Sequence, residues 1–310
     1  MKKRVLIFGA GVIGSTFGGL MALSGIDITI LARNKRFKEL QENGLLLKRY
    51  NQQEVQKINI NLISELEEDD IYDFVFVTLR KEQVAQSLQI LNKNKSQNFV
   101  FMVNNSSGYD DWVNALGQER VIPAFPGSGG KIENAIVQYE IVSKFVQPTT
   151  LGELNGKTSF RLKELVIILK KSGFNVAISN KMDVWQKTHV AMVGPLGDVI
   201  YYDGGNNYSV SANSKAIHQM NLALKENFNF LHESGIGIEP RKLLFFRFVP
   251  ISILDFLMKF VFNTKWAETV ISNHAQNARS EMKVISNEFI DLAKSKGYDL
   301  IEFKKLADKI

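Results

Sequence analysis

Residues 5–14 read Val-Leu-Ile-Phe-Gly-Ala-Gly-Val-Ile-Gly, and this stretch decides the fold. Its first four residues form an apolar run of strand length, and the pattern Gly-x-Gly-x-x-Gly follows at Gly9, Gly11 and Gly14. The glycine pattern alone is weak evidence, but here it lies between a predicted strand and a helix predicted over Ser15–Leu23. Gly9 permits a tight turn, Gly11 lets a pyrophosphate approach the main chain, and Gly14 lets helix and strand pack closely. The stretch therefore predicts a dinucleotide-binding loop.

The start of the helix after this loop adds to the prediction, because its unpaired N–H groups and positive dipole attract phosphate. A merely structural glycine turn is the alternative. We expect six consecutive residues to contact the dinucleotide: Gly9, Ala10, Gly11, Val12, Ile13 and Gly14.

The end of the second predicted strand, Asp27–Leu31, distinguishes the two nicotinamide dinucleotides. A site for NAD usually places Asp or Glu there to hold the ribose 2′-hydroxyl. This chain continues with Ala-Arg-Asn-Lys-Arg at residues 32–36, with no carboxylate. The guanidinium of Arg33 can hold a 2′-phosphate through paired, charge-assisted hydrogen bonds. NADP(H) is therefore favoured over NAD(H), and Lys35 and Arg36 either assist or remain solvated loop charges.

Alternating strand and helix patterns continue to about residue 180 and then change. A nearly continuous apolar run, expected where both faces of a sheet are covered, lies at Tyr72–Thr78, and further strands are predicted at Phe99–Val103, Val121–Phe125 and Val137–Phe145. After Lys181 strand signals nearly vanish, and long amphipathic helices are predicted over Ala212–Ser234 and Asn277–Lys296. The predicted fold class is an α/β Rossmann-type doubly wound sheet followed by an all-α C-terminal domain. We place the NADP-binding Rossmann domain at residues 1–180 and a helical domain for substrate binding or dimerisation at 181–310.

Composition narrows the classes of function. The 310 residues carry a net charge of +6 and a pI near 9.2, which favours anionic partners such as nucleotides or acidic substrates. The cations are scattered, so nucleic-acid binding is not expected. Cysteine is absent and the four histidines lack metal-ligand spacing, so no metal site is predicted. The basic and apolar N-terminus is interrupted by Gly9 and Gly11, so we expect a buried strand and a cytoplasmic protein rather than a signal peptide.

The segment Leu243–Phe262 is long and apolar enough to raise the question of a membrane span. Arg247, Asp255 and Lys259 interrupt it, and charges at those depths are unfavourable in lipid. Pro250 is expected to split it into two short helices. No membrane span is predicted, and core packing or a homodimer interface is expected, with an apolar substrate pocket or peripheral membrane contact as alternatives.

Four segments together resemble the ketopantoate reductase family. They are VLIFGAGVIGSTFGGLMALSGIDITILAR at 5–33, YDFVFVTLRKEQV at 72–84, VFMVNNSSGYDD at 100–111 and VWQKTHVAMVGPLGDVI at 184–200. The resemblance is strong in the first 35 residues and near Lys187, and patchy elsewhere. It implies reduction of a small-molecule 2-oxo acid to a 2-hydroxy acid by NADPH.

The resemblance also implies roles for single residues. Lys187 would be the general acid that protonates the carbonyl oxygen, and its ammonium would stabilise the developing alkoxide. Asn105, or Asn104 if the alignment slips by one, would lie between cofactor and substrate. Three further residues would line the cofactor: Thr78, Leu79 and Arg80, the last standing where the family usually has lysine.

The substrate half departs from the family pattern. Ala191 and Gly194 occupy positions where the family has asparagine, and Glu281 replaces a serine that helps bind a substrate carboxylate. A glutamate there would repel a carboxylate, and the acidic segment that normally follows Met282 is missing. We therefore predict a reductase of a ketone or 2-oxo acid other than ketopantoate. A non-catalytic protein that senses NADP(H) is the alternative.

Two further features leave their roles open. His189 lies two residues after Lys187, so on a helix the two side chains point apart. It is either an alternative acid or, as we expect, a packed or surface residue. The glycine-rich turn Phe125–Lys131 follows a strand end and either covers the nicotinamide or substrate or is a plain flexible loop.

Overall fold

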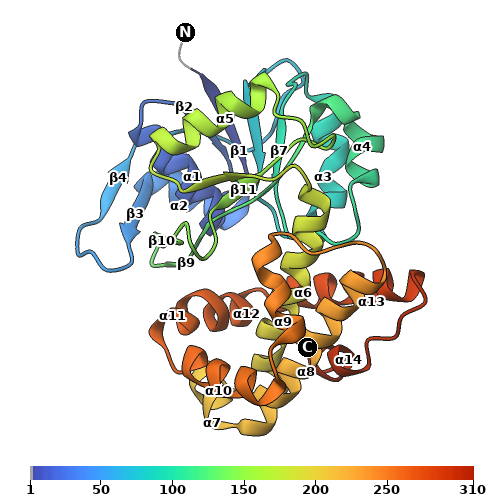
Figure 1. Cartoon of the computed structure of the whole chain (residues 1–310). Helices are drawn as coiled ribbons and strands as arrows, with labels where there is room; N and C mark the ends of the chain where they lie inside the picture. Colours follow the sequence, from blue (N-terminus) through green and yellow to red (C-terminus); the bar gives the residue numbers. More distant parts are fainter. Residues whose placement is uncertain (1–2) are drawn as a thin grey trace. The chain divides into compact units, whose positions relative to one another are not determined.

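The computed structural model describes residues 3–310, apart from the side chain of His274. The chain forms two compact units, coloured along the sequence in Figure 1. The first, here called the sheet unit, runs to Val103 and resumes over Tyr109–Met182. The second, the helical unit, contains Asn104–Gly108 and Asp183–Ile310. The predicted fold class is confirmed, because the sheet unit is a wound α/β sheet and helices alone make up the chain after it.

The main sheet of the described chain has eight strands and brings the glycine loop to its centre. In spatial order they are β12 (Val176–Ile178), β11 (Thr149–Leu151), β8 (Val121–Phe125), β7 (Phe99–Met102), β6 (Phe74–Val77), β1 (Arg4–Phe8), β2 (Asp27–Leu31) and β5 (Asn61–Ile63). The pairs are parallel except β11 with β8. β1 pairs with β2 and β6 in a register that aligns Phe8 with Leu31 and Val77. The loops after these three strands therefore begin at the same edge of the sheet.

Helices cover both faces of this sheet, which explains why its strands are apolar throughout. The helices of the sheet unit are α1 (Val12–Leu23), α2 (Asn34–Asn43), α3 (Lys81–Lys93), α4 (Asp110–Leu116), the 3₁₀ turn η1 (Gln118–Arg120) and α5 (Phe160–Lys171). One apolar cluster joins α1 and α5 to the sheet, and another joins α3 and α4 to it, on opposite sides in Figure 1. Both faces are thus closed to water, as parallel sheets require.

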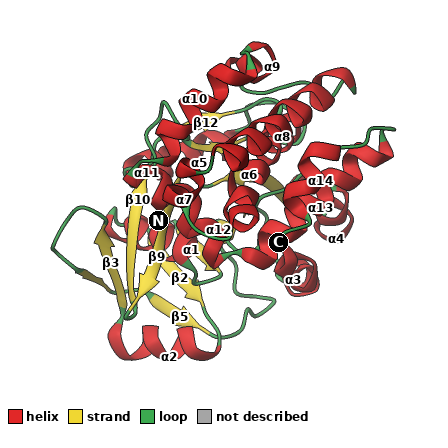
Figure 2. Cartoon of the chain, turned by 90° about the horizontal axis from the view of Figure 1, so that it is seen from below, coloured by secondary structure: helices red, strands yellow, loops and turns green. Residues whose placement is uncertain are grey.

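A second sheet packs on α1 and was not predicted from the sequence. Its strands, in spatial order, are β4 (Gln56–Ile58), β3 (Leu45–Arg49), β10 (Ile136–Ile141) and β9 (Ser128–Glu133), of which the last three lie side by side in Figure 2. A Cβ atom on Gly18 would lie 3.0 Å from Ile7 in the main sheet, and one on Gly19 would lie 2.5 Å from Leu47 in the second. These two glycines let α1 pack between two sheets, and its apolar residues all around fit that buried position.

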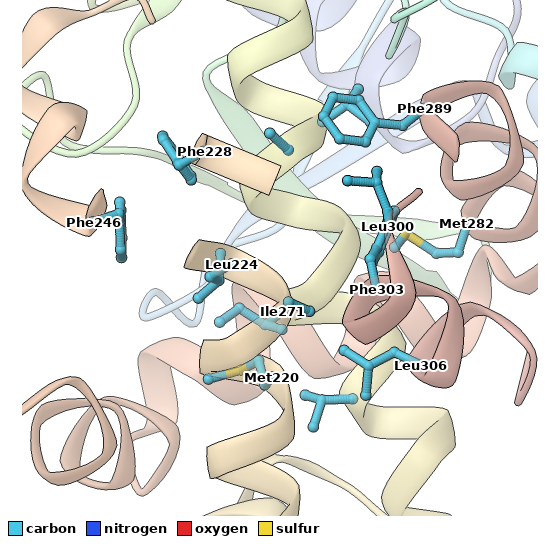
Figure 3. Packing of buried hydrophobic residues seen from close by; sticks show 14 of the residues in the cluster. Met220, Leu224, Phe228, Phe246, Ile271, Met282, Phe289, Leu300, Phe303 and Leu306 are labelled. Atoms are coloured by element: carbon cyan, nitrogen blue, oxygen red, sulfur yellow. The ribbon is translucent and has the colours of Figure 1, made fainter. Parts of the chain in front are cut away.

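The helical unit surrounds α6 (Met182–Asp203), which its apolar cluster includes. The other elements are α7 (Asn207–Ala212), α8 (Ser214–Glu233), η2 (Arg241–Leu244), α9 (Phe245–Phe248), α10 (Ile251–Phe262), α11 (Lys265–Ala267), η3 (Glu268–Ser272), α12 (Asn273–Asn277), α13 (Arg279–Ser295) and α14 (Ile301–Ala307). Figure 3 shows side chains of the cluster, among them Met282, Phe289 and Phe303. This core is built from helix faces alone.

Several local predictions were corrected. The helix predicted over Ala212–Ser234 is α8, which begins at Ser214 because Asn213 caps it with its side-chain oxygen, whereas Ala212 ends α7. The turn at Phe125–Lys131 is not a plain flexible loop, since its second half is strand β9. A Cβ atom on Gly130 would lie 2.0 Å from the Gln138 carbonyl oxygen, so glycine is needed for the close strand pairing there.

The segment Leu243–Phe262 divides at Pro250, as predicted, with α9 before it and α10 after it. None of the helices in the described chain combines the length and apolarity that a bilayer crossing requires. α10 is apolar on two faces: Leu254 and Phe262 are buried, whereas Phe256 and Phe260 are 63% and 59% exposed. Packing in the core therefore explains the buried apolar face of α10 but not the exposed one.

Candidate functional site

The glycine loop connects β1 to α1 and has the geometry of a phosphate cradle. Gly9 adopts φ +119°, a conformation that favours glycine. A Cβ atom on Gly14 would lie 2.0 Å from the Gly9 carbonyl oxygen, so this position requires glycine for packing. A Cβ atom on Gly11 would meet nothing within 4 Å. The space beside Gly11 is thus open where a pyrophosphate would approach the start of α1, and the residues present fit a dinucleotide.

The segment after β6 supports this loop rather than only lining it. Thr78 Oγ1 donates a hydrogen bond of 2.8 Å to the Gly9 carbonyl oxygen. The Leu79 side chain lies 3.0 Å from where a Gly9 Cβ atom would be. Arg80 precedes the first residue of α3, and its side chain is exposed. The structure therefore brings Thr78 and Leu79 to the loop, and a role in lining the cofactor stays a prediction for both.

Arg33 lies two residues after the last residue of β2, at the same edge of the sheet as the glycine loop. Its side chain is exposed, and no residue in the described chain pairs with its guanidinium. The first turn of α2, directly after it, contains cations and no acidic residue. Cations at a helix N-terminus are unfavourable unless an anion binds there. This arrangement suits a bound phosphate.

The two neighbouring cations do not share the position of Arg33. The Lys35 side chain is 91% exposed and its Nζ lies 3.7 Å from Glu39. Arg36 turns back toward the glycine loop, where its Nε donates a 3.1 Å hydrogen bond to the Ala10 carbonyl oxygen. Arg36 therefore stabilises the shape of the loop, a role that its place in the sequence does not reveal.

Lys187 lies on α6 in the helical unit, and its side chain is 13% exposed. Its ammonium pairs with the Asp183 carboxylate one turn earlier on the same helix. His189 is buried and stacks on Trp185 with ring centroids 5.2 Å apart, as expected of a packed histidine. The sequence analysis missed Asp183, although its spacing of four residues from Lys187 is the signal that finds such pairs.

The loop Asn104–Gly108 belongs to the helical unit, and its two asparagines form hydrogen bonds with different partners. The Asn105 side chain is buried and closes the loop: its Nδ2 donates to Gly108 O at 2.7 Å, and its Oδ1 accepts from Ser107 Oγ at 3.0 Å. Asn104 Nδ2 instead donates a 3.1 Å hydrogen bond to Glu281 Oε1. Of the two candidate asparagines, Asn104 therefore contacts the residue in which this chain departs most from the family.

At Ala191 and Gly194, the other two positions that depart from the family pattern, neighbouring groups pack closely. The Ala191 side chain is fully buried, and its carbonyl oxygen accepts a 3.1 Å hydrogen bond from Asn227 Nδ2. A Cβ atom on Gly194 would lie 2.7 Å from the Phe303 ring. Side chains from elsewhere in the unit thus occupy the space that a larger polar residue at 194 would need. Packing within the helical unit therefore accounts for the residues at both positions.

The described residues contain no group of three or more His, Cys, Asp or Glu side chains placed to hold a metal ion. The predicted site residues fall into two sets, one in each unit. The sheet unit holds the glycine loop, Arg33 and the segment after β6. The helical unit holds Lys187 and the loop with Asn104 and Asn105.

Known proteins resemble this chain along most of its length. The family model of ketopantoate reductase PanE/ApbA matches residues 5–156. The oxidoreductase YkpB of Bacillus subtilis is 25% identical over 255 residues, which span 76% of this chain and 77% of that protein. The 2-dehydropantoate 2-reductase of Pyrococcus horikoshii is 23% identical over 253 residues, 78% of either chain. The solved structure of D-mandelate dehydrogenase with NADH and anilino(oxo)acetate has a TM-score of 0.79 at 15% identity and covers 99% of this chain and 96% of that one, a likeness of fold.

Proposed function

Because residues 5–156 of this chain belong to the ketopantoate reductase family, a family of oxidoreductases, we propose that it is an NADPH-dependent reductase of a small ketone or 2-oxo acid other than ketopantoate. The observation that carries the cofactor choice is Arg33, exposed beside a helix start whose charged residues are all cations. A homodimer and a cytoplasmic location remain predictions that accompany this function.

The residues of the sheet unit would hold the dinucleotide. N–H groups at the start of α1 would bind the pyrophosphate beside Gly11, where no side chain intervenes. Arg33 would hold the 2′-phosphate with two parallel N–H···O bonds. The bound dinucleotide would supply a hydride to the carbonyl carbon of the substrate.

Lys187 would supply the proton. Its ammonium would protonate the carbonyl oxygen, so that a C=O group becomes a CH–OH group, and its positive charge would stabilise oxygen as negative charge develops there. The Asp183 carboxylate, one turn earlier on α6, contacts this ammonium and fixes its place on the helix. Asp183 would therefore position the proton donor rather than react itself.

Fluorescence titration with NADPH and NADH tests the cofactor assignment. Arg33→Ala is expected to weaken NADPH binding by about ten- to a hundredfold, the value of a charge-assisted pair, and to leave NADH binding unchanged. Lys35→Ala removes the same charge two residues away and serves as the control, with little change for either dinucleotide. Equal or tighter binding of NADH by the wild-type protein refutes the choice of NADPH, and failure to bind either one removes the enzyme proposal.

Turnover with NADPH and a panel of ketones and 2-oxo acids tests the catalytic assignment. Lys187→Ala is expected to lower kcat by about a hundredfold to ten-thousandfold while the dissociation constant of NADPH stays the same. Lys305→Ala removes another paired helix lysine of the same unit and should retain full activity. Any hydroxy product excludes the non-catalytic sensor, whereas wild-type kcat in Lys187→Ala would contradict the role of this lysine.

A further inference from the structure

Glu281 is a buried carboxylate with one hydrogen-bond partner. It lies in the first turn of α13 and is 7% exposed. Its Oε1 accepts the bond from Asn104 Nδ2 described above, and no other residue in the described chain donates to this carboxylate or forms an ion pair with it. A carboxylate with so little water around it normally has a cation or several donors nearby.

The structural role of Glu281 accounts for part of this arrangement. An acidic side chain in the first turn of a helix interacts favourably with the helix dipole, and Glu281 has that position in α13. That interaction does not require burial, since acidic residues at exposed helix starts gain it as well. One neutral amide and a helix terminus leave the acceptor capacity of the carboxylate largely unused.

The partner of Glu281 has an unused acceptor too. Asn104 Oδ1 is buried and has no hydrogen-bond partner in the described structure, and the same holds for the Ser106 hydroxyl in the same loop. Buried polar atoms without partners are rare in folded proteins and require an explanation. Glu281 and Asn104 thus present at least two oxygen acceptors in one place, without a donor to match them.

The position of Asn104 in the chain links this pair to ligand binding. Asn104 follows Met102, the last residue of β7, by two positions. β7 is parallel to β6, and β6 is parallel to β1, which leads into the glycine loop. Ligands of open α/β sheets bind outside the carboxyl ends of such strands. Asn104 therefore follows the carboxyl end of a strand, the kind of position at which ligands of such sheets bind.

We propose that Glu281 and Asn104 select a substrate with a protonated amino group next to its carbonyl group and disfavour a carboxylate in that position. This inference rests on the proposed reductase function and names its substrate class as aminoketones. The ammonium would donate to Glu281 and to Asn104 Oδ1, which satisfies both acceptors and neutralises the buried charge. A 2-oxo acid would place two carboxylates together in a site of low water content.

Three ketones with the same three-carbon skeleton test the proposal: aminoacetone, hydroxyacetone and pyruvate. The wild-type protein is expected to reduce aminoacetone with a kcat/KM at least about tenfold above that for pyruvate, because the charge pair is attractive in one case and repulsive in the other. Glu281→Gln is expected to abolish this preference. Glu302→Gln, which removes an acidic residue from the first turn of α14, is the control and should leave the ratio unchanged. A merely structural role of Glu281 would lower stability in the thermal melt without altering the ratio.

Binding of the corresponding alcohols to the protein with NADP⁺ gives a readout that does not depend on turnover. Calorimetry should detect 1-amino-2-propanol with wild-type protein, weaker binding with Glu281→Gln, and no comparable binding of lactate. If lactate or pyruvate is preferred, or if Glu281→Gln leaves the preference unchanged, the proposal is overturned while the reductase function stands. If amine binding depends on Glu281 but no ketone is reduced, the recognition site stands and the reductase function fails.

Discussion

Two alanine substitutions in the glycine loop should separate the glycine that folds the protein from the glycine that binds the ligand. At Gly14 an added Cβ atom would lie 2.0 Å from the Gly9 carbonyl oxygen and 2.5 Å from Thr78 Oγ1. Main-chain atoms cannot swing away as a flexible side chain can, so the overlap must strain the loop. Overpacking of this kind usually lowers the free energy of unfolding by about 1–3 kcal/mol, and the missing freedom of the main chain places Gly14→Ala at or above the upper end.

At Gly11 the balance is different. The residue has φ −71°, which alanine adopts without strain, and an added Cβ atom would meet nothing within 4 Å. Alanine restricts the unfolded chain, which stabilises the fold by about 0.4–1 kcal/mol. It is also a poorer residue than glycine before a helix, which offsets a similar amount. The net change in stability of Gly11→Ala should thus be close to zero.

For NADPH binding the order should be reversed, so that Gly11→Ala weakens binding more than Gly14→Ala does. A methyl group on Gly11 occupies the open space beside the start of α1 and keeps the pyrophosphate from the N–H groups there. Losing one charge-assisted hydrogen bond of about 1.5–3 kcal/mol raises the dissociation constant by about ten- to a hundredfold.

Thermal unfolding and NADPH titration, measured on both variants, check this reasoning. Gly14→Ala should melt at least about 6–12 °C below wild type, given about 2–4 °C per kcal/mol for a domain of this size, and Gly11→Ala should melt with wild type. The interpretation of the loop is refuted if Gly11→Ala binds NADPH as tightly as wild type, or if it loses as much stability as Gly14→Ala.

Three further predictions concern the helical unit. Burial raises the pKa of Asp198 well above its usual value of 3.8, so the unfolded chain releases this proton at lower pH than the folded chain. The free energy of unfolding should therefore fall as pH rises above about 4. In urea titrations at several pH values, Asp198→Asn should show a smaller fall than the wild-type protein. Identical pH profiles of the two proteins would contradict this role of Asp198. Replacing both Phe256 and Phe260 with lysine should lower the dimer fraction measured by sedimentation velocity. The melting temperature should not fall, since both rings are more than half exposed. A wild-type protein that stays monomeric at all concentrations refutes the predicted homodimer. Gly194→Asn should lower the free energy of unfolding by about 1–3 kcal/mol in a urea titration, because it collides with Phe303, and wild-type stability would show that the ring can move aside.

The elements that sequence patterns predicted well are those whose signals are local. The strands at Asp27–Leu31 and Val121–Phe125 have the predicted bounds, because short apolar runs set them. The three-residue strands β4 and β5 were missed. Strands this short show no periodicity, and they form only because the second sheet and the edge of the main sheet supply partners.

In the candidate site, too, the residues with local signals could be predicted and those that depend on long-range contacts could not. The glycine loop could be read from sequence because each glycine answers a constraint within ten residues of itself. Arg36 could not be assigned, because the same cation can point to solvent, to a ligand or, as it does, to the Ala10 carbonyl oxygen. The bond between Asn104 and Glu281 joins residues 177 positions apart, and no local pattern indicates it.

The residues that depart from the family pattern can be explained only when α6, the helix that carries Lys187, is considered together with the helices that pack against it. Gly194 faces Phe303, and a Cβ atom on Gly197 would lie 2.5 Å from Met282, so small residues on α6 and large apolar ones on α13 and α14 are matched. The one strongly polar residue in this region that pairs with the loop after β7 is Glu281, next in sequence to Met282. A buried carboxylate at the edge of this apolar packing fits the proposed change of substrate, since the carboxylate is unfavourable there unless a ligand compensates for it.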